Sequence, residues 1–451
     1  MTTQIGTSIG DVATAQNPVP HEGLRAQARE LAPTALALVF ALSWIGAEPF
    51  PSLGSDTVLQ ADKAVDPLNL LSYLAVGGLS VAVAFILRPH TFRIALRPIT
   101  LLMLCWLVVS VITSSDPNLS ARRLALTIVM IGMSIAVMPL PTNLRQFSKV
   151  LAAIALLVLA LCFGGGMFLP QFAIHQLTDM PEPLLTGDWR GIFAHKNVAA
   201  SMMVVFIFTG ILTARVLDRY LGALIIALSL TFMFLAGGKT ALALLAPTLL
   251  LAPVFLNSRS KILRALIVAA PVTILNLGTV GSVMFPAIGQ FNKMMLPDPT
   301  FTGRTDIWQF ALDNLQQRLT FGFGYSAFWQ TSATMFGGKA DTENAQERGD
   351  DIVSVADHAH NAYLDTALTT GLPGLALTIT WLLVQPFWDI SRAQRNGAPP
   401  ALLLYFTQIW MFCINFACLE SLYYHRTDPV WFMLLMATSG MAALARYRIK
   451  L

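Results

Sequence analysis

His360 and Asn361 stand where the longest hydrophilic stretch of the chain, about residues 289–361, meets an apolar segment. Gly371 and Gly374 follow within that segment. An imidazole can take up or release a proton near neutral pH, because its ordinary pKa is about 6.5. A titratable group at a membrane surface, on a helix whose next turns contain glycine and small residues, predicts chemistry on a substrate carried by a lipid.

A second group of polar residues lies further upstream. Arg190 precedes Gly191, and His195, Lys196 and Asn197 open an apolar run. Asn197 can cap the helix expected there, and a helix N-terminus attracts anions. The group would suit a phosphate, although a plain helix cap with anchoring side chains explains the same residues.

Arg304 follows a glycine and begins a segment with helical periodicity, from Thr305 to Leu319. We expect an amphipathic surface helix that lies on the outer face of the membrane or against the spans. Its expected apolar face contains Ile307, Phe310, Ala311 and Leu315.

Two other patterns suggest a bound ligand. Lys239 lies in a GGKT sequence, but the glycine that a phosphate-binding loop requires is replaced by Met233, so a nucleotide site is excluded. Asp357, His358 and His360 could bind a metal, because histidine and carboxylate groups are common ligands. The sequence shows no third strong ligand, so we predict neither a metal nor a cofactor.

These residues must be positioned by membrane helices. The chain has 451 residues, of which 55% are hydrophobic and 12% charged, with a mean hydropathy of +0.62. Soluble proteins contain about 25% charged residues. Repeated apolar runs near 20 residues therefore predict an all-α polytopic membrane protein. We expect about twelve spans: 31–47, 68–87, 99–114, 124–140, 150–169, 198–214, 220–236, 241–256, 264–286, 364–388, 400–418 and 429–445.

The spans divide the chain into four parts. We predict a cytoplasmic N-terminal tail without a cleaved signal (1–30), spans one to nine (31–288), an outward loop (289–361), and spans ten to twelve with a short cytoplasmic tail (362–451). Residues 338–353 are acidic and rich in turn-forming residues, so we expect a mobile loop there.

The orientation follows from charge. The segments on one side hold 17 basic and 5 acidic residues, against 12 and 20 on the other. Positive charge favours the cytoplasmic side, so we place both termini there and the long loop outside, in the periplasm of a Gram-negative host. Basic residues stand out on the acidic outward side, among them Arg122, Arg123 and Arg426.

Together these residues resemble the O-antigen ligase and polymerase superfamily, which includes O-antigen ligases, Wzy-type polysaccharide polymerases and ExoQ-like exopolysaccharide polymerases. His360, Asn361, Gly371 and Gly374 match its motif, at the end of a large loop late in the chain. Arg304 and Arg190 resemble its outward arginines, and GIFAHKN (191–197) is more similar to the exopolysaccharide polymerases. The resemblance covers roughly residues 185–385.

The resemblance implies a glycosyltransferase in the bacterial inner membrane, with its site facing the periplasm. The donor would be a glycan on undecaprenyl diphosphate, and the acceptor a glycan or lipid A-core. The lipid bilayer and other polysaccharide assembly proteins are expected partners, and nucleic acid is not. We favour a polymerase over a ligase, and a transporter of lipid-linked glycan is the alternative of another class. The predicted catalytic residues are His360, Arg304 and Arg190, and the predicted substrate-binding residues are Asn361, His195, Lys196, Lys239, Gly371 and Gly374.

Overall fold

The computed structural model describes residues 20–51, 67–177, 179, 185–329 and 356–447. Within these ranges the chain is helical, and the only extended pairing is an isolated bridge between Ile174 and Trp189. The predicted all-α class is therefore confirmed. The mobile loop predicted at 338–353, most of the N-terminal tail and the last residues of the C-terminal tail lie outside the described residues.

Nine helices of the described chain are long and apolar enough to cross a membrane. Three shorter apolar helices accompany them, so every one of the predicted segments has a helical counterpart, although the number that span a membrane stays a prediction. The nine are α1 (Pro20–Ile45), α2 (Pro67–Leu87), α4 (Pro117–Ala136), α5 (Leu144–Phe168), α7 (Lys196–Val216), α9 (Lys239–Asn257), α10 (Lys261–Gly278), the continuous run of α16 (Ala362–Ile379), η5 (Thr380–Val384) and α17 (Gln385–Arg395), and α19 (Pro429–Arg446). The shorter three are α3 (Pro98–Ile112), α8 (Arg219–Leu235) and α18 (Pro400–Phe416).

Some helices begin or end at residues other than the predicted ones, because local capping interactions fix their ends. The helix α4 begins at Pro117, before the apolar run, because Asp116 caps it and proline suits a first helical position. The ninth predicted segment is divided, since α10 ends at Gly278 and Thr279 leaves the helical conformation. The short helices η2 (Pro89–Ile94), α6 (Pro170–Ala173), α11 (Val280–Met284) and α12 (Pro286–Met295) lie between the longer ones.

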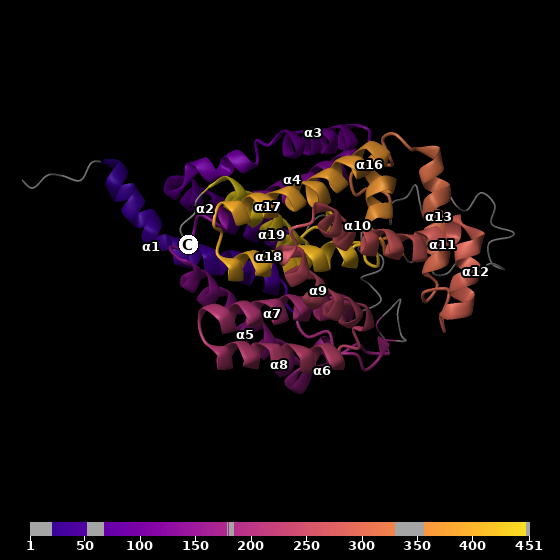
Figure 1. The fold of residues 1–451 in the computed structure, drawn as a ribbon, viewed down its shortest axis with the longest axis horizontal. Coiled ribbons are helices and arrows are strands. Elements are labelled where there is room, and N and C mark those ends of the chain that lie inside the picture. Colours follow the sequence, from indigo (N-terminus) through magenta and orange to yellow (C-terminus); the bar gives the residue numbers. More distant parts are fainter. Residues whose placement is uncertain (1–19, 52–66, 178, 180–184, 330–355, 448–451) are drawn as a thin grey trace, which may run out of the picture.

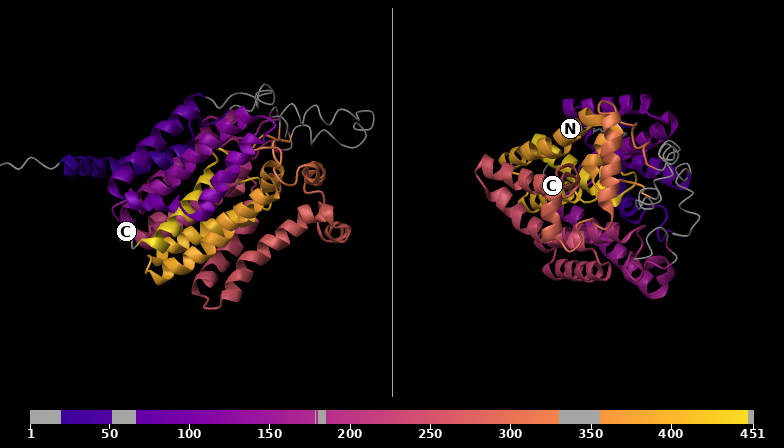
Figure 2. Two further views of the ribbon diagram at one scale, coloured as in Figure 1. Left: turned by 90° about the horizontal axis from the view of Figure 1, so that it is seen from above. Right: turned by 90° about the vertical axis from the view of Figure 1, so that its right-hand side faces the viewer.

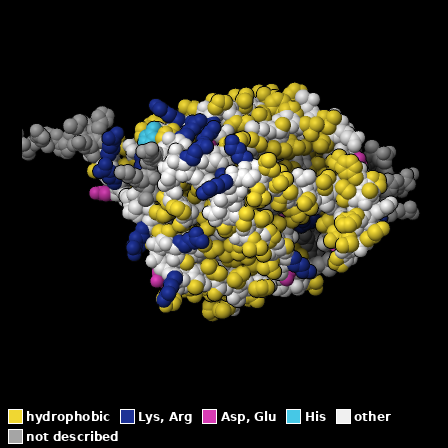
Figure 3. Space-filling model, in the orientation of Figure 1, with side chains coloured by type: hydrophobic (Ala, Val, Ile, Leu, Met, Phe, Trp, Pro, Cys, Tyr) yellow, Lys and Arg dark blue, Asp and Glu magenta, His cyan; other side chains and the backbone are white. Residues whose placement is uncertain are grey.

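The long helices run side by side as a bundle (Figure 1, Figure 2). The helices α7, α18 and α19 form its centre, because most of their side chains are buried. Figure 3 shows a broad hydrophobic surface on the face in view, with most of the visible Lys and Arg side chains gathered at the end where the C-terminus lies. This distribution agrees with the predicted orientation, which remains a prediction.

The predicted amphipathic helix is confirmed as α13 (Arg304–Gln317). It lies with α11 and α12 beyond one end of the bundle (Figure 1). Ile307, Ala311 and Leu315 are buried as predicted, and Trp308 is buried in addition. This face packs against the first turns of α16 in a separate hydrophobic cluster, so α13 helps to hold the segment that carries His360.

Candidate functional site

Asn361 fixes the start of α16. Its side-chain oxygen accepts hydrogen bonds from the backbone N–H groups of Tyr363 and Leu364, at 3.1 and 3.0 Å. Its amide nitrogen donates to Asn276 of α10 and to the carbonyl of Cys418, both at 2.9 Å. Asn361 is fully buried, so the structure gives it a capping and bridging role, and its predicted substrate contact stays a prediction.

The backbone on either side of Asn361 is held by the segment after α18. The N–H of Asn361 donates to the Ser421 hydroxyl at 3.2 Å, and the N–H of Ala362 donates to the Ala417 carbonyl at 2.8 Å. Trp308 of α13 donates its indole N–H to the Ala359 carbonyl at 2.9 Å. His360 is thus fixed from two sides, in a left-handed backbone conformation with φ of 48°. Non-glycine residues rarely adopt this conformation, and such strain is concentrated at functional sites.

Glu420 is the centre of the cluster. One of its carboxylate oxygens accepts from Nδ1 of His360 at 3.0 Å, and the other accepts from Arg304 and from the Asn197 amide, each at 2.9 Å. Arg304 also donates to the Leu419 carbonyl at 2.7 Å. Three distant parts of the chain, the start of α7, the start of α13 and the residue before α16's cap, therefore meet at one carboxylate.

The pairing of His360 with Glu420 selects one imidazole tautomer. Since the carboxylate can only accept, Nδ1 carries the proton and Nε2 is left as a base. Burial and the neighbouring His358 lower the pKa of His360 to about 4, although Glu420 opposes this shift. Burial raises the pKa of Glu420, but Arg304 and His360 outweigh it and hold that pKa well below its usual range. At neutral pH the cluster therefore contains a carboxylate, a guanidinium and a neutral imidazole.

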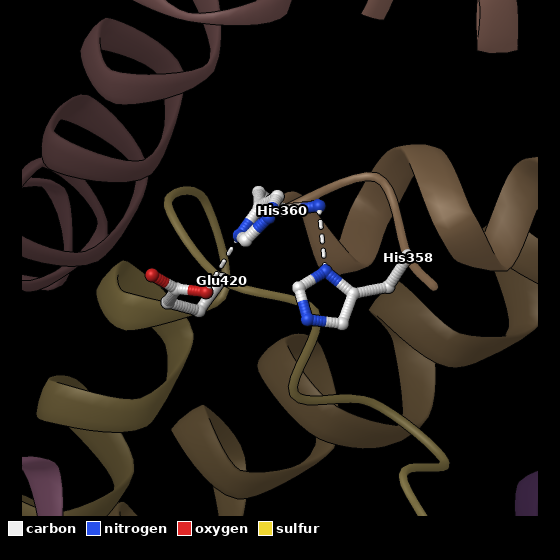
Figure 4. A group of neighbouring side chains, drawn as sticks. All are labelled: His358, His360 and Glu420. Carbon is white, nitrogen blue, oxygen red and sulfur yellow. Dashed lines mark hydrogen bonds and ion pairs between the residues drawn. The ribbon is translucent and has the colours of Figure 1, made fainter. Parts of the chain in front are cut away.

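His358 packs beside His360 (Figure 4). Their ring centroids are 4.1 Å apart, and Nδ1 of His358 accepts from the backbone N–H of His360 at 3.2 Å. Burial lowers the pKa of His358, but the carboxylates of Asp357, Glu420 and Asp365 outweigh burial and raise it above its ordinary value. His358 therefore supports His360 directly, which the spacing of the two residues left open.

The structure brings a third group that could bind a metal, Glu420, close to the two histidines. His358, His360 and Glu420 each present a ligand atom within 4.8 Å of the others. The ligand atoms of a tetrahedral zinc site lie about 3.4 Å apart, so this set would have to contract. Arg304 pairs with the same carboxylate and would repel a metal cation. The arrangement suits an ion-pair network better than a metal, and the predicted absence of a metal stays a prediction.

Gly371 and Gly374 allow close packing. Gly371 interrupts α16 with φ of 73° and ψ of 176°, and a Cβ there would lie 2.0 Å from the Thr320 carbonyl oxygen. The carbonyls of Leu368 and Thr369 accept from Phe323 and Gly324, while Trp106 of α3 donates to that of Thr370. A Cβ on Gly374 would lie 2.8 Å from Nε1 of Trp106. The geometry gives both glycines a packing role, and their contact with substrate is untested.

The upstream polar group, residues 190–197, lies beside the cluster, but most of its described contacts are with other partners. Arg190 is 1% exposed and donates to the carbonyls of Phe193 and Pro51, at 3.1 and 2.9 Å. His195 caps α7, and Lys196 pairs with Asp188 at 2.5 Å. Asn197 of this group donates to Glu420. The catalytic role predicted for Arg190 and the substrate contacts predicted for His195 and Lys196 stay predictions, but the geometry favours positioning roles.

Lys239 stands apart as the exposed first residue of α9. Its position at a helix N-terminus follows the left-handed Gly237 and the capping Gly238. No contact in the described residues joins its side chain to the cluster, so its predicted role in substrate binding remains a prediction.

An apolar groove lies beside the cluster, because Asn361, the chain neighbour of His360, lines it. It has a volume of about 820 Å³ and is bounded by α10, α11, α13 and the run from α16 to α17. Asn276 and Asn361 contribute polar side chains to its lining. Its other lining residues are largely apolar and include Val268, Val272, Leu375 and Trp388. The groove could hold a hydrocarbon chain whose head lies near His360.

Sequence reasoning missed Glu420. The residue follows the predicted span 400–418 in CLESLYYHR, where an acidic group beside an apolar run is conspicuous. Buried carboxylates are rare without a partner, so this position carried a usable signal. Its partners could not be named, since they lie elsewhere in the chain.

Two comparisons bear on this site. Residues 196–379 match the family model described as O-antigen ligase. The chain is also 28% identical over 163 residues to the exopolysaccharide production protein ExoQ of Rhizobium meliloti (strain 1021). That match covers 36% of this chain, and the chain spans about a third (34%) of the length of the relative.

The matched region contains Asn197, Arg304, His360, Asn361 and the two glycines of α16, whereas Glu420 lies beyond its end. The family match includes these positions, and the roles predicted for them stay predictions. The chain is therefore similar to the O-antigen ligase family through residues 196–379, and the separate match to ExoQ supports a relationship to the ExoQ-like proteins.

Proposed function

We propose that this protein is a membrane glycosyltransferase that moves a glycan from undecaprenyl diphosphate to a hydroxyl group of an acceptor glycan. The observation that carries the proposal is the pairing of His360 Nδ1 with Glu420, beside Arg304 and next to Asn361, which lines an apolar groove. We place the reaction on the side of the membrane that the charge pattern predicts to face outward.

The groove supports a lipid-linked donor. Its volume accommodates part of a polyprenyl chain, and a diphosphate held near Asn361 would lie beside the cluster. Arg304 uses one N–H of each terminal nitrogen for Glu420 and Leu419, so further guanidinium N–H groups remain for phosphate oxygens. Arg190 would not contact the diphosphate. Its hydrogen bonds to backbone carbonyls would hold residues 190–197, and therefore Asn197, in position.

The chemical step is a substitution at the anomeric carbon of the donor. Nε2 of His360 takes the proton of the acceptor hydroxyl while the acceptor oxygen forms its bond to that carbon. The bond from the carbon to the diphosphate breaks, and its electron pair leaves with the diphosphate. Arg304 stabilises the negative charge that develops there. No metal takes part in this scheme, so activity should survive exhaustive EDTA treatment; loss that Zn²⁺ or Mn²⁺ restores would contradict it.

Polymerisation of a repeat unit is the favoured reaction, because ExoQ is named for exopolysaccharide production. Ligation to lipid A-core is the second candidate, because the matching family model is described as O-antigen ligase. Purified full-length protein should be given one lipid-linked glycan, with a second lipid-linked repeat or lipid A-core as separate acceptors. A ladder of repeats supports the polymerase, and a single shift of the lipid A-core band supports the ligase.

His360→Ala protein is the control for either product. If the wild-type protein forms no glycosidic bond with either acceptor, the proposed transfer reaction is wrong. Movement of a labelled lipid-linked glycan across a vesicle membrane without bond formation would instead support a transporter.

A further inference from the structure

A second cavity, of about 350 Å³, has His358 in its wall. Unlike the apolar groove, it is lined by polar and aromatic groups, among them Arg123, Tyr325, Trp329, His358 and Arg426. Its volume is near the lower end of the ~300–1,000 Å³ range of ligand pockets, and its lining suits a short stretch of glycan better than lipid. His360 and Arg304, which carry out the proposed transfer step, do not line this cavity.

The two cavities lie on opposite faces of α16. Leu364 and Ala367 line the apolar groove, whereas Asp365, Thr366 and Thr369 line the polar cavity. At about 100° per residue these two sets point in opposite directions from the helix axis. His360 stands just before the first turn of α16, so molecules held in the two cavities would approach it from opposite sides.

The polar cavity contains two arginines, Arg123 and Arg426. Arg123 donates to the Ser326 carbonyl, and both Arg123 and Arg426 act electrostatically on Tyr325. Within the described residues, the guanidinium of Arg426 makes no hydrogen bond or ion pair. The two carboxylates of the cavity are engaged: Asp365 accepts from Trp329 and Ser421, and Asp357 pairs with His358. An acidic ligand group would meet Arg426 without displacing a carboxylate.

The backbone around the cavity is strained. Ser326, Tyr424 and Thr427 all line it and have φ values of 53°, 61° and 57°. Non-glycine residues keep such conformations only where the surrounding structure imposes them, and they are concentrated at ligand sites. The strain therefore indicates a cavity shaped for an occupant.

We infer that this polar cavity binds the acceptor glycan and that Arg426 selects an acceptor carrying an acidic group. The inference rests on the proposed transfer function, since it places the acceptor, the second substrate of that reaction, in the polar cavity. A donor anchored by its lipid in the apolar groove and an acceptor in the polar cavity would meet at Nε2 of His360.

The test uses detergent-solubilised full-length protein and two soluble probes, a uronic-acid-containing trisaccharide and the same trisaccharide with its carboxyl group reduced. Calorimetric titration should show the acidic probe binding about tenfold or more tightly, as expected for one charge-assisted hydrogen-bonded pair. Arg426→Gln should remove this preference, and Arg426→Lys should retain part of it. Arg122→Gln is the matched control, because Arg122 is exposed on the same helix as Arg123 and does not line the cavity.

Equal binding of the two probes, or equal effects of Arg426→Gln and Arg122→Gln, would overturn the inference. Inorganic pyrophosphate serves as a third probe. If it binds the wild-type protein and Arg426→Gln abolishes that binding, the cavity belongs to the donor diphosphate and the acceptor assignment is wrong. Retained melting temperature in Arg426→Gln separates loss of binding from loss of fold.

The failures of the two proposals are distinguishable. Wild-type protein that binds the acidic probe selectively but forms no glycosidic bond would refute the transfer function and leave the acidic-glycan site standing. Protein that polymerises a lipid-linked repeat but binds the acidic and reduced probes alike would refute the acceptor site alone.

Discussion

At the scale of single residues, the site depends on which hydrogen-bond donors each of the two oxygens of one carboxylate accepts from. Glu420 gives one oxygen to His360 and the other to Arg304 and Asn197. The same group thus orients the proposed base and holds the cation that would stabilise the leaving diphosphate. His358 contributes from the other side by accepting the backbone N–H of His360.

Replacement of His360 by alanine should abolish transfer while the protein still inserts and accumulates. A general base contributes roughly 10²–10⁴-fold to a reaction rate, and the His360 side chain is 20% exposed, so little packing is lost. His358→Ala should retain more activity, because it removes only a supporting contact. Polymer formed per unit of membrane-inserted protein is the measurement. Normal activity in His360→Ala would refute its role as the base, and equal loss in both variants would indicate a shared structural role.

Glu420→Gln should change the pH dependence as well as the rate. The base must be unprotonated, so activity is complete above the pKa of His360 and is lost as the pH falls through about 4. Glu420 raises that pKa, so a neutral glutamine should move the acid limb of kcat/KM to still lower pH and reduce the plateau. A pH–rate profile measures both effects. An acid limb that moves to higher pH would show that Glu420 does not act on His360 in this way.

At the scale of secondary structure, the break in α16 decides how the loop before it docks. Gly371 leaves the helical conformation, so carbonyls near the break accept hydrogen bonds from residues 323 and 324. The first turns of α16 therefore form a separate short unit, covered by α13 on one side and by α3 on the other. This unit carries His360 at its start and separates the two cavities.

Gly371→Ala should destabilise this unit strongly. The residue has a φ and ψ that only glycine adopts easily, which costs about 1–3 kcal/mol for other residues, and the new Cβ would clash with the Thr320 carbonyl. Gly397→Ala is the control, because Gly397 also has a positive φ, of 75°, but open space around it. Thermal melting in detergent should show a clearly larger loss for Gly371→Ala. Equal losses would mean that backbone strain alone, and not the close approach, requires glycine.

At the scale of the whole molecule, the charge distribution predicts the orientation in the membrane. Basic side chains gather at one end of the bundle, and α13 lies beyond the opposite end (Figure 1, Figure 3). The cluster at the start of α16 is packed against α13, so it belongs to that opposite end.

Single cysteines in a background without the four native ones should report this orientation. A cysteine at Gln316, exposed on α13, should react with a membrane-impermeant thiol reagent in intact spheroplasts. A cysteine at Asn396, exposed after α17, should react only after the membrane is broken, because basic loops remain in the cytoplasm. The reverse labelling pattern would overturn the orientation and, with it, the outward placement of the site.

The sequence by itself determined the features that depend on neighbouring residues. Apolar runs located a helix for each predicted segment, because hydrophobicity and helix length are local properties. The periodicity after Arg304 located α13 and most of its buried face. The motif from His360 to Gly374 identified the segment at which α16 begins, and the charges of short loops gave an orientation that still awaits its test.

Only the tertiary structure decided how the site residues are used. Glu420 is 60 positions from His360 and 116 from Arg304, so no local pattern could join them. The burial of Arg190 among carbonyls, the capping role of Asn361 and the carbonyl that lies against Gly371 likewise follow from contacts between distant helices. A residue's type limits the chemistry it can do, but its partners, and hence its charge state and exposure, are set by the packing of segments that the sequence keeps apart.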